Sequence, residues 1–360
     1  MKNKSKNKVF QIISKRIFFI SFILTFQLFS QNEFNEIGII HKGDGGIVSP
    51  GIMNINKGII ENISQYNDSL DQEQIYDHHI TPTFFDLNIY DSSRVIHYDS
   101  LLVRNGIVYY LLKAENRIYF HKVAPFSENK LLGYFYENNE LTSGGFHNLY
   151  HKFEDDLAFS KYYLDKQNLN KLPHNEQLSA DNFKKLLKGK YSLWLHNFTK
   201  KQFTLFSKLL KKYEIEIVYL PKNIDWKITT LDNATVIVDL PSIFQIEENV
   251  NLINDFESYF GLNSNLYYKI FEKEKLFNND FFKNNPILEI LTDEEFIQYC
   301  AIFPSQFFGL DDRIGILRKS FSANYVVFTA EPFTEDSFVK KVYIDGIEIY
   351  SNKDTTTQSN

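Results

Sequence analysis

Short groups of apolar residues alternate with glycine-rich turns at both ends of the chain. Residues 37–63 contain several such groups, with the turn Lys42–Gly46 between the first two, a pattern typical of β-hairpins. Residues 86–123 are rich in valine, isoleucine, tyrosine and phenylalanine, which favour strands. Two β-rich stretches follow in residues 325–350, where Asp345–Gly346 is a strong hairpin signal. Both ends of the chain are therefore predicted to be β-structure.

The middle of the chain has a different spacing of apolar residues. Leu149, Phe153 and Leu157 recur every four residues, which places them on one face of a helix. Runs of strand length separate such helical segments. The expected elements are strands over 191–195, 215–220 and 235–240, and helices over 148–167, 200–213 and 292–303. This alternation of strands and helices predicts an α/β fold with a parallel sheet and crossover helices.

The first 30 residues have the three parts of a secretory signal peptide. Lysines and Arg16 precede the apolar run Ile17–Phe29, and the small residue Ser30 follows it. We expect cleavage near Ser30, which makes the mature protein secreted or periplasmic and leaves it no stable membrane span. A retained signal anchor is the alternative, although the run is shorter than the roughly 20 apolar residues that span a bilayer. Residues 353–360 are polar and are predicted to form a disordered tail.

Composition excludes several classes of function. The chain has 360 residues, of which 43% are hydrophobic, so it can bury a large core. Its formal net charge of -6 gives no electrostatic signature of nucleic-acid binding. The single cysteine, Cys300, can form neither an internal disulfide nor a thiolate zinc cluster. Any metal would have to be held by histidine, aspartate or glutamate.

Several segments resemble the metal-dependent amidohydrolase superfamily, and in particular its imidazolonepropionase-like branch. Near the C-terminus they are FPSQFFGLDDRIG at 303–315, YVVF at 325–328 and VKKVYIDG at 339–346. In that family a helix ends in a run of the form "NPA…lG…driGsl", and a strand and a final hairpin follow. Upstream, residues 101–112 and 185–220 resemble further parts of the family pattern. The resemblance covers most of the mature chain.

The resemblance implies a (β/α)8 TIM-like barrel and a small β-sandwich that is built from both chain ends. On this basis we expect the β-sandwich to comprise residues 35–81 and 300–352, and the barrel to comprise residues 82–299. The segment 82–291 has about 210 residues, near the lower limit for a complete barrel. Residues 113–136 also lack the pattern of a crossover helix. We therefore expect one or more barrel units to be shortened or open.

The same resemblance implies hydrolysis of C–N bonds by a water that is bound to one or two divalent metals such as zinc. The first barrel strand of the family carries two histidines separated by one residue, so that both point to the same side. The matching stretch here is Thr81–Tyr90, in which Asn88 and Tyr90 stand at the two histidine positions. An amide is a weak ligand, and a phenol is protonated below about pH 10. The first-strand metal ligands are thus replaced, and no bound cofactor is expected.

Other positions of the family motif have partial counterparts. His196 ends a predicted strand and is a candidate for a residual metal ligand, as the family's fifth-strand histidine. With Asn197 it is also a candidate binding residue at the barrel mouth. Asp280 is the available candidate for the catalytic carboxylate that activates the water. His147 and His151 are four residues apart, so they share one face of the predicted helix, as zinc ligands can.

Three hypotheses about function follow. The leading hypothesis is a secreted amidohydrolase-like protein that is catalytically inactive and binds a small molecule or assembles with a second copy. The second is an active metal-dependent amidohydrolase with a site rearranged around His147, His151 and His196. The third is a non-catalytic subunit that partners an active relative. Stoichiometric metal in the purified mature protein would favour the second hypothesis over the first.

Overall fold

A computed structural model describes most of the chain as two compact units. The described residues are 34–67, 78–125, 128–137, 143–166, 181, 183–221, 234–239, 266–269, 271, 291–334 and 337–352. We call residues 1–83 with 309–360 the β-sheet unit, and residues 84–308 the barrel unit. The predicted signal peptide and the tail at 353–360 lie outside the described residues. Among the helices that are described, none is long and apolar enough to cross a membrane.

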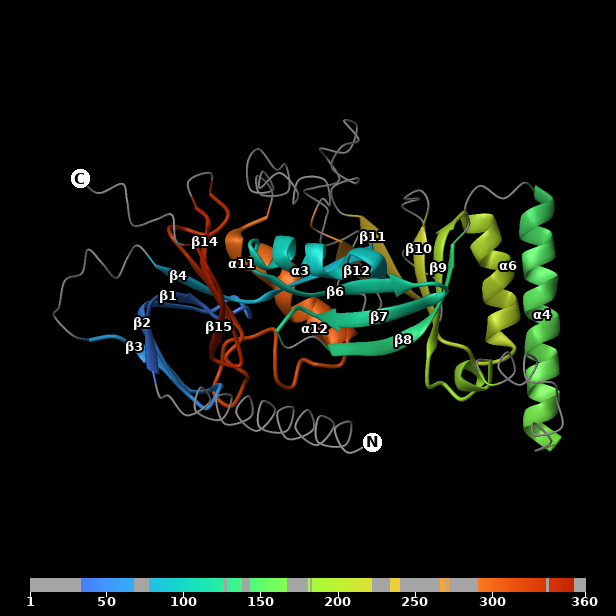
Figure 1. The fold of residues 1–360 in the computed structure, drawn as a ribbon, viewed down its shortest axis with the longest axis horizontal. Helices are drawn as coiled ribbons and strands as arrows, with labels where there is room; N and C mark the ends of the chain where they lie inside the picture. Colours follow the sequence, from blue (N-terminus) through green and yellow to red (C-terminus); the bar gives the residue numbers. More distant parts are fainter. Residues whose placement is uncertain are drawn as a thin grey trace, which may run out of the picture. The chain divides into compact units, whose positions relative to one another are not determined.

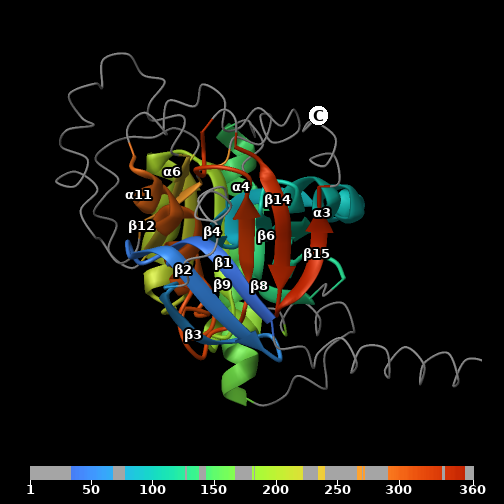
Figure 2. The same cartoon turned by 90° about the vertical axis from the view of Figure 1, so that its left-hand side faces the viewer.

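The β-sheet unit joins the two ends of the chain in one sheet (Figure 2). Its seven strands, in spatial order, are β15 (Ile347–Ser351), β14 (Val339–Ile344), β13 (Tyr325–Phe328), β4 (His79–Pro82), β1 (Phe34–His41), β2 (Ile47–Asn56) and β3 (Ile59–Gln65). Strand β4 connects the halves because it pairs parallel with β1 and antiparallel with β13. Met53 from the first half and Tyr343 from the second belong to one hydrophobic core. The prediction that both chain ends build one small β-rich unit is confirmed.

The barrel unit contains a second sheet of eight strands (Figure 1). In spatial order they are β12 (Leu266–Lys269), β11 (Ala234–Asp239), β10 (Ile217–Pro221), β9 (Ser192–Phe198), β8 (Glu128–Glu137), β7 (Arg117–Lys122), β6 (Ile107–Ala114) and β5 (Phe84–Asp91). Strands β5, β6, β8, β9, β10, β11 and β12 run in one direction, and β7 runs against them. The fold is therefore a mixed α/β barrel fold. Among the connections that the structure describes, the one from β6 to β8 is an interrupted βα unit.

Strand β7 occupies the place of a crossover helix. The connection from β6 to β8 turns at Glu115 and Asn116 and returns through β7 within the sheet. The turn needs a left-handed residue, and Glu115 has a φ of 54°. This geometry confirms the expectation that residues 113–136 lack a crossover helix and that a barrel unit is shortened.

Helices pack on the remaining strands of the barrel unit. They are η1 (Ser92–Arg94), α3 (Val95–Val103), α4 (Ser143–Lys166), α6 (Lys200–Lys211), α11 (Asp293–Ile297), the π-helical turn η5 (Gln298–Ile302) and α12 (Phe303–Phe307). Thr199 and Gln202 form a capping box that starts α6. The C-terminal boundary of the barrel unit lies at 308, later than the expected 299, because Phe308 stacks on Phe85 of β5 and so keeps α12 with the barrel.

Candidate functional site

Asp86 on β5 is the centre of the first-strand region in which the sequence predicted lost metal ligands. Asp86 is buried, and its exposed fraction is 1%. The backbone N–H of Asn88 and the side-chain Nδ2 of Asn88 both donate to Asp86 Oδ1 at 2.9 Å. The hydroxyl of Tyr90 donates to Asp86 Oδ2 at 2.5 Å. Both carboxylate oxygens of Asp86 thus accept hydrogen bonds from Asn88 and Tyr90, the two residues that the family resemblance aligns with histidines. We call Asp86, Asn88 and Tyr90 the first-strand network.

The local course of β5 explains this arrangement. The pairing of β5 with β6 shifts register between Asp86 and Ile89, as at a β-bulge. A bulge takes a backbone N–H out of the ladder, and the carboxylate of Asp86 accepts the N–H of Asn88 instead. Asn88 Nδ2 also donates to the carbonyl oxygen of Phe271 at 2.6 Å. Asn88 therefore connects β5 to the segment that follows β12.

Tyr90 lies in the core and does not line an open site. Its exposed fraction is 1%, and its ring packs against Tyr98 of α3 and Tyr110 of β6 at centroid distances of 4.7 Å and 5.2 Å. Burial raises the pKa of Tyr90 well above its usual value of 10, and the charge of Asp86 raises it further. The phenol consequently stays protonated and serves as a hydrogen-bond donor.

The first-strand network does not fit a divalent metal. A metal ligand must offer a lone pair, whereas Tyr90 and the Nδ2 group of Asn88 direct protons toward Asp86. Nearby Cys300 is buried, and its burial raises the pKa of the thiol well above the usual value. Across the ranges that the structure describes, no three histidine, cysteine, aspartate or glutamate side chains are grouped so as to hold a metal ion.

A second polar group lies at the carboxyl ends of β6, β8 and β9, and we call it the strand-end cluster. Lys113 Nζ donates to Glu137 Oε2 at 2.9 Å, and His196 Nδ1 lies 3.1 Å from Glu137 Oε1. Burial alone would raise the pKa of Glu137, but the hydrogen bonds and charges of Lys113 and His196 lower it below its usual value. The ring of Phe135 lies beneath Lys113 Nζ, 4.8 Å away, and close to His196.

The strand-end cluster stands where barrel proteins carry their active sites, because loops after the strands converge at that edge. The side chains of Lys113, Glu137 and His196 are about one quarter to one third exposed, so a solute can reach them. Asn197 follows His196 with a φ of 61°, a left-handed conformation that asparagine tolerates. His196 was predicted as a strand-end residue, whereas Lys113 and Glu137 were not singled out.

The other predicted site residues do not join this cluster. His147 and His151 lie on α4, with their Nε2 atoms 3.0 Å apart, and His151 Nδ1 lies 3.6 Å from Glu154 Oε2. Both side chains belong to a solvent-exposed stretch of the helix, whereas His196 is held by Glu137. Asp280 falls outside the described residues.

Comparison with known proteins identifies the fold. No protein-family model and no curated protein matches the sequence. An amidohydrolase from Thermotoga maritima MSB8 matches the structure with a TM-score of 0.70 and 14% identity, over 88% of this chain and 99% of that one. A second amidohydrolase has a TM-score of 0.52 and 11% identity, over 89% of this chain and 100% of its own. A prolidase complexed with N-methylphosphonate-L-proline has a TM-score of 0.53 and 9% identity, over the same shares. At these identities the likeness shows a shared fold, and it confirms the resemblance to amidohydrolases at that level.

Proposed function

We propose that this chain, which has the amidohydrolase fold, is an exported protein that has lost metal-dependent C–N bond hydrolysis and retains a binding role. The observation that carries the proposal is the first-strand network. Two side chains stand where the family resemblance places metal-binding histidines, and both donate hydrogen bonds to Asp86. Export is supported by the signal-like pattern of residues 1–30.

Two energetic costs oppose a metal ion at this position. Ionising Tyr90 at pH 7 would be unfavourable, because burial and the charge of Asp86 raise the pKa of its phenol well above the usual value of 10. Breaking the hydrogen bonds from Asn88 to the buried Asp86 would cost roughly 1.5–3 kcal/mol for each bond to the charged group. A divalent ion would have to offset these terms with ligands that the network does not supply.

The strand-end cluster supports the binding role. It presents a cation, a carboxylate and an imidazole at an accessible edge, and these groups can recognise a polar small molecule without metal chemistry. The alternative of a hydrolase rearranged around His147, His151 and His196 gains no support from the contacts described above. Assembly with a second copy or with an active relative remains a separate proposal, which co-purification from the native source tests.

Metal analysis of the mature protein tests the loss of catalysis. The protein is dialysed against excess zinc and then against metal-free buffer, and bound metal is measured by mass spectrometry. We expect well under one equivalent of metal and no hydrolysis of a panel of N-acyl amino acids and cyclic amides. One tightly bound equivalent, or turnover that a chelator abolishes, would contradict the proposal. N-terminal sequencing of the exported protein would separately show whether cleavage occurs near Ser30.

A further inference from the structure

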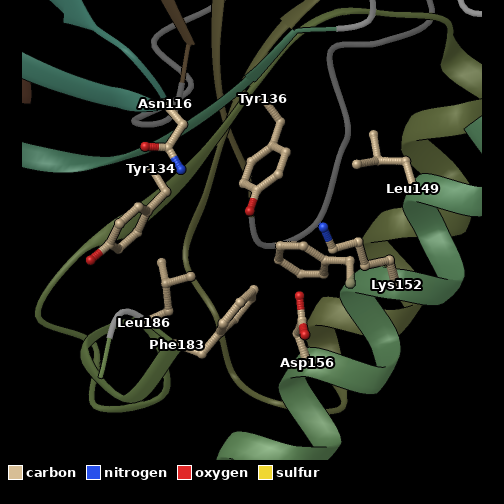
Figure 3. A pocket seen from close by; sticks show the side chains of 9 residues that line it. Asn116, Tyr134, Tyr136, Leu149, Lys152, Asp156, Phe183 and Leu186 are labelled. Carbon is tan, nitrogen blue, oxygen red and sulfur yellow. The ribbon is translucent and has the colours of Figure 1, made fainter. Parts of the chain in front are cut away.

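The barrel unit has a pocket that shares no residue with the first-strand network or the strand-end cluster (Figure 3). Its volume is about 260 Å³. Four aromatic rings form much of its wall, those of Tyr134, Tyr136, Phe153 and Phe183. Phe153 packs edge-on against Tyr136 and Phe183 at centroid distances of 5.4 Å and 5.1 Å. Ring contacts thus hold the aromatic part of the wall together.

The pocket lies beside β8, next to the interrupted βα unit. Tyr134 and Tyr136 come from β8, and Asn116 comes from the turn between β6 and β7. Figure 3 shows Leu149, Lys152 and Asp156 on the opposite side, all from α4. Because β7 replaces a crossover helix, the connection from β6 to β8 places no helix against this part of β8. The fold therefore leaves room for a ligand here.

Two opposite charges line the pocket one helical turn apart. Lys152 and Asp156 are four residues apart on α4, where side chains at this spacing are neighbours. Within the described part of the chain, neither side chain forms an ion pair or a hydrogen bond, with the other or with any residue. Burial raises the pKa of Asp156, although the charge of Lys152 works against this rise. Burial raises the pKa of Tyr136 to about 12, and the nearby Asp156 contributes, so its hydroxyl stays a donor.

We propose that this pocket binds a small zwitterion of the α-amino-acid class with an apolar side chain. The ammonium group would pair with Asp156, the carboxylate with Lys152, and the side chain would lie against the aromatic rings. A ligand with a single charge would match one of these residues and repel the other. The volume lies below the range of roughly 300–1,000 Å³ that is common for drug-sized ligands, which limits the occupant to a small molecule.

Calorimetric titration of the purified mature protein with three related probes tests this assignment. L-phenylalanine carries both charges, phenethylamine carries only the ammonium group, and 3-phenylpropionate carries only the carboxylate. We expect L-phenylalanine or L-leucine to bind at least about tenfold more tightly than either singly charged probe. Equal binding of the three phenyl probes, or no binding of either amino acid, would overturn the proposal. The outcome does not depend on metal binding or catalysis.

Matched variants on α4 locate the binding site. Asp156→Asn and Lys152→Gln should each weaken amino-acid binding about tenfold or more, because a charge-assisted contact is lost. Asp155→Asn removes the same charge from the exposed neighbouring position and should leave the affinity unchanged. Circular dichroism verifies that all three variants fold. If Asp156→Asn binds as tightly as Asp155→Asn, the ligand does not occupy this pocket.

Discussion

The hydrogen bond from Tyr90 to Asp86 makes a direct test of the first-strand network. Tyr90→Phe keeps the ring that packs against Tyr98 and Tyr110 and removes only the hydroxyl. Asp86 is buried, so no solvent replaces the lost donor at Oδ2. The variant therefore isolates the contribution of one charge-assisted hydrogen bond.

A hydrogen bond to a charged group contributes about 1.5–3 kcal/mol to stability, and the buried setting of Asp86 favours the upper part of that range. For a unit of the size of residues 84–308, each kcal/mol shifts the midpoint of thermal unfolding by roughly 2–4 °C. We expect Tyr90→Phe to lower the midpoint of the barrel unit by about 3–12 °C. Differential scanning calorimetry measures the shift, and urea unfolding gives the free energy independently.

Tyr191→Phe is the control, because Tyr191 contacts Tyr134 through its ring and its hydroxyl makes no hydrogen bond among the described residues. This control should change stability by less than about 0.5 kcal/mol. If Tyr90→Phe lowers the free energy of unfolding no more than Tyr191→Phe does, the hydroxyl of Tyr90 does not stabilise Asp86. Tyr90 would then not be the donor that we propose in place of a metal ligand.

Two further predictions concern backbone packing and pH. Gly133→Ala would place a Cβ atom 2.0 Å from the carbonyl oxygen of Ser192 on β9, and should lower the free energy of unfolding in urea by at least about 3 kcal/mol. In the control Gly189→Ala the new Cβ meets no atom within 4 Å, so the left-handed φ alone should lower it by about 1 kcal/mol. Similar losses in the two variants would show that β8 and β9 are not so close. His79 Nδ1 lies 3.0 Å from His41 Nε2, and burial together with the nearby histidines lowers the pKa of His79 to about 4. Between pH 6.5 and 4 the unfolded chain therefore binds more protons than the folded chain. Up to about 3 kcal/mol of stability that is present above pH 6.5 should be lost as the pH falls to 4. His79→Asn should flatten this acid dependence in pH-resolved urea unfolding, and His97→Asn, at an exposed position, should leave it unchanged.

The sequence predicted elements well where local signals and burial agree. The amphipathic segment 200–213 corresponds to α6, and the Asp345–Gly346 turn joins β14 to β15 with positive φ at both residues. Helix α3 was missed, because its sequence VIHYDSLLV is rich in β-branched and aromatic residues. The side chain of Asp91 caps η1, the short helix that leads into α3, by accepting a hydrogen bond from the backbone N–H of Ser93. Helix α3 itself buries Tyr98 and Leu102. Tertiary packing therefore overrides local propensity in α3.

The candidate site was predictable only in part. The TPTFFDLNIY motif identified Asn88 and Tyr90, because a motif gives positions along one strand. It could not show that both side chains donate to Asp86, because this depends on the bulge in β5. The strand-end cluster escaped prediction for a related reason. Lys113 on β6 and Glu137 on β8 are 24 residues apart in the sequence, and no local pattern links them.

Asn88 and Tyr90 act together on the buried carboxylate of Asp86. A buried carboxylate such as Asp86 needs donors or a cation, since an unpaired charge in the interior costs several kcal/mol. Asn88 and Tyr90 supply three donors, so the carboxylate is satisfied without an ion. Neutral histidines at both positions would each offer one lone pair to a metal, and Asp86 would lose the amide and phenol donors that it now has. A metal site at these positions would therefore have to compensate Asp86 for these donors as well as bind the ion.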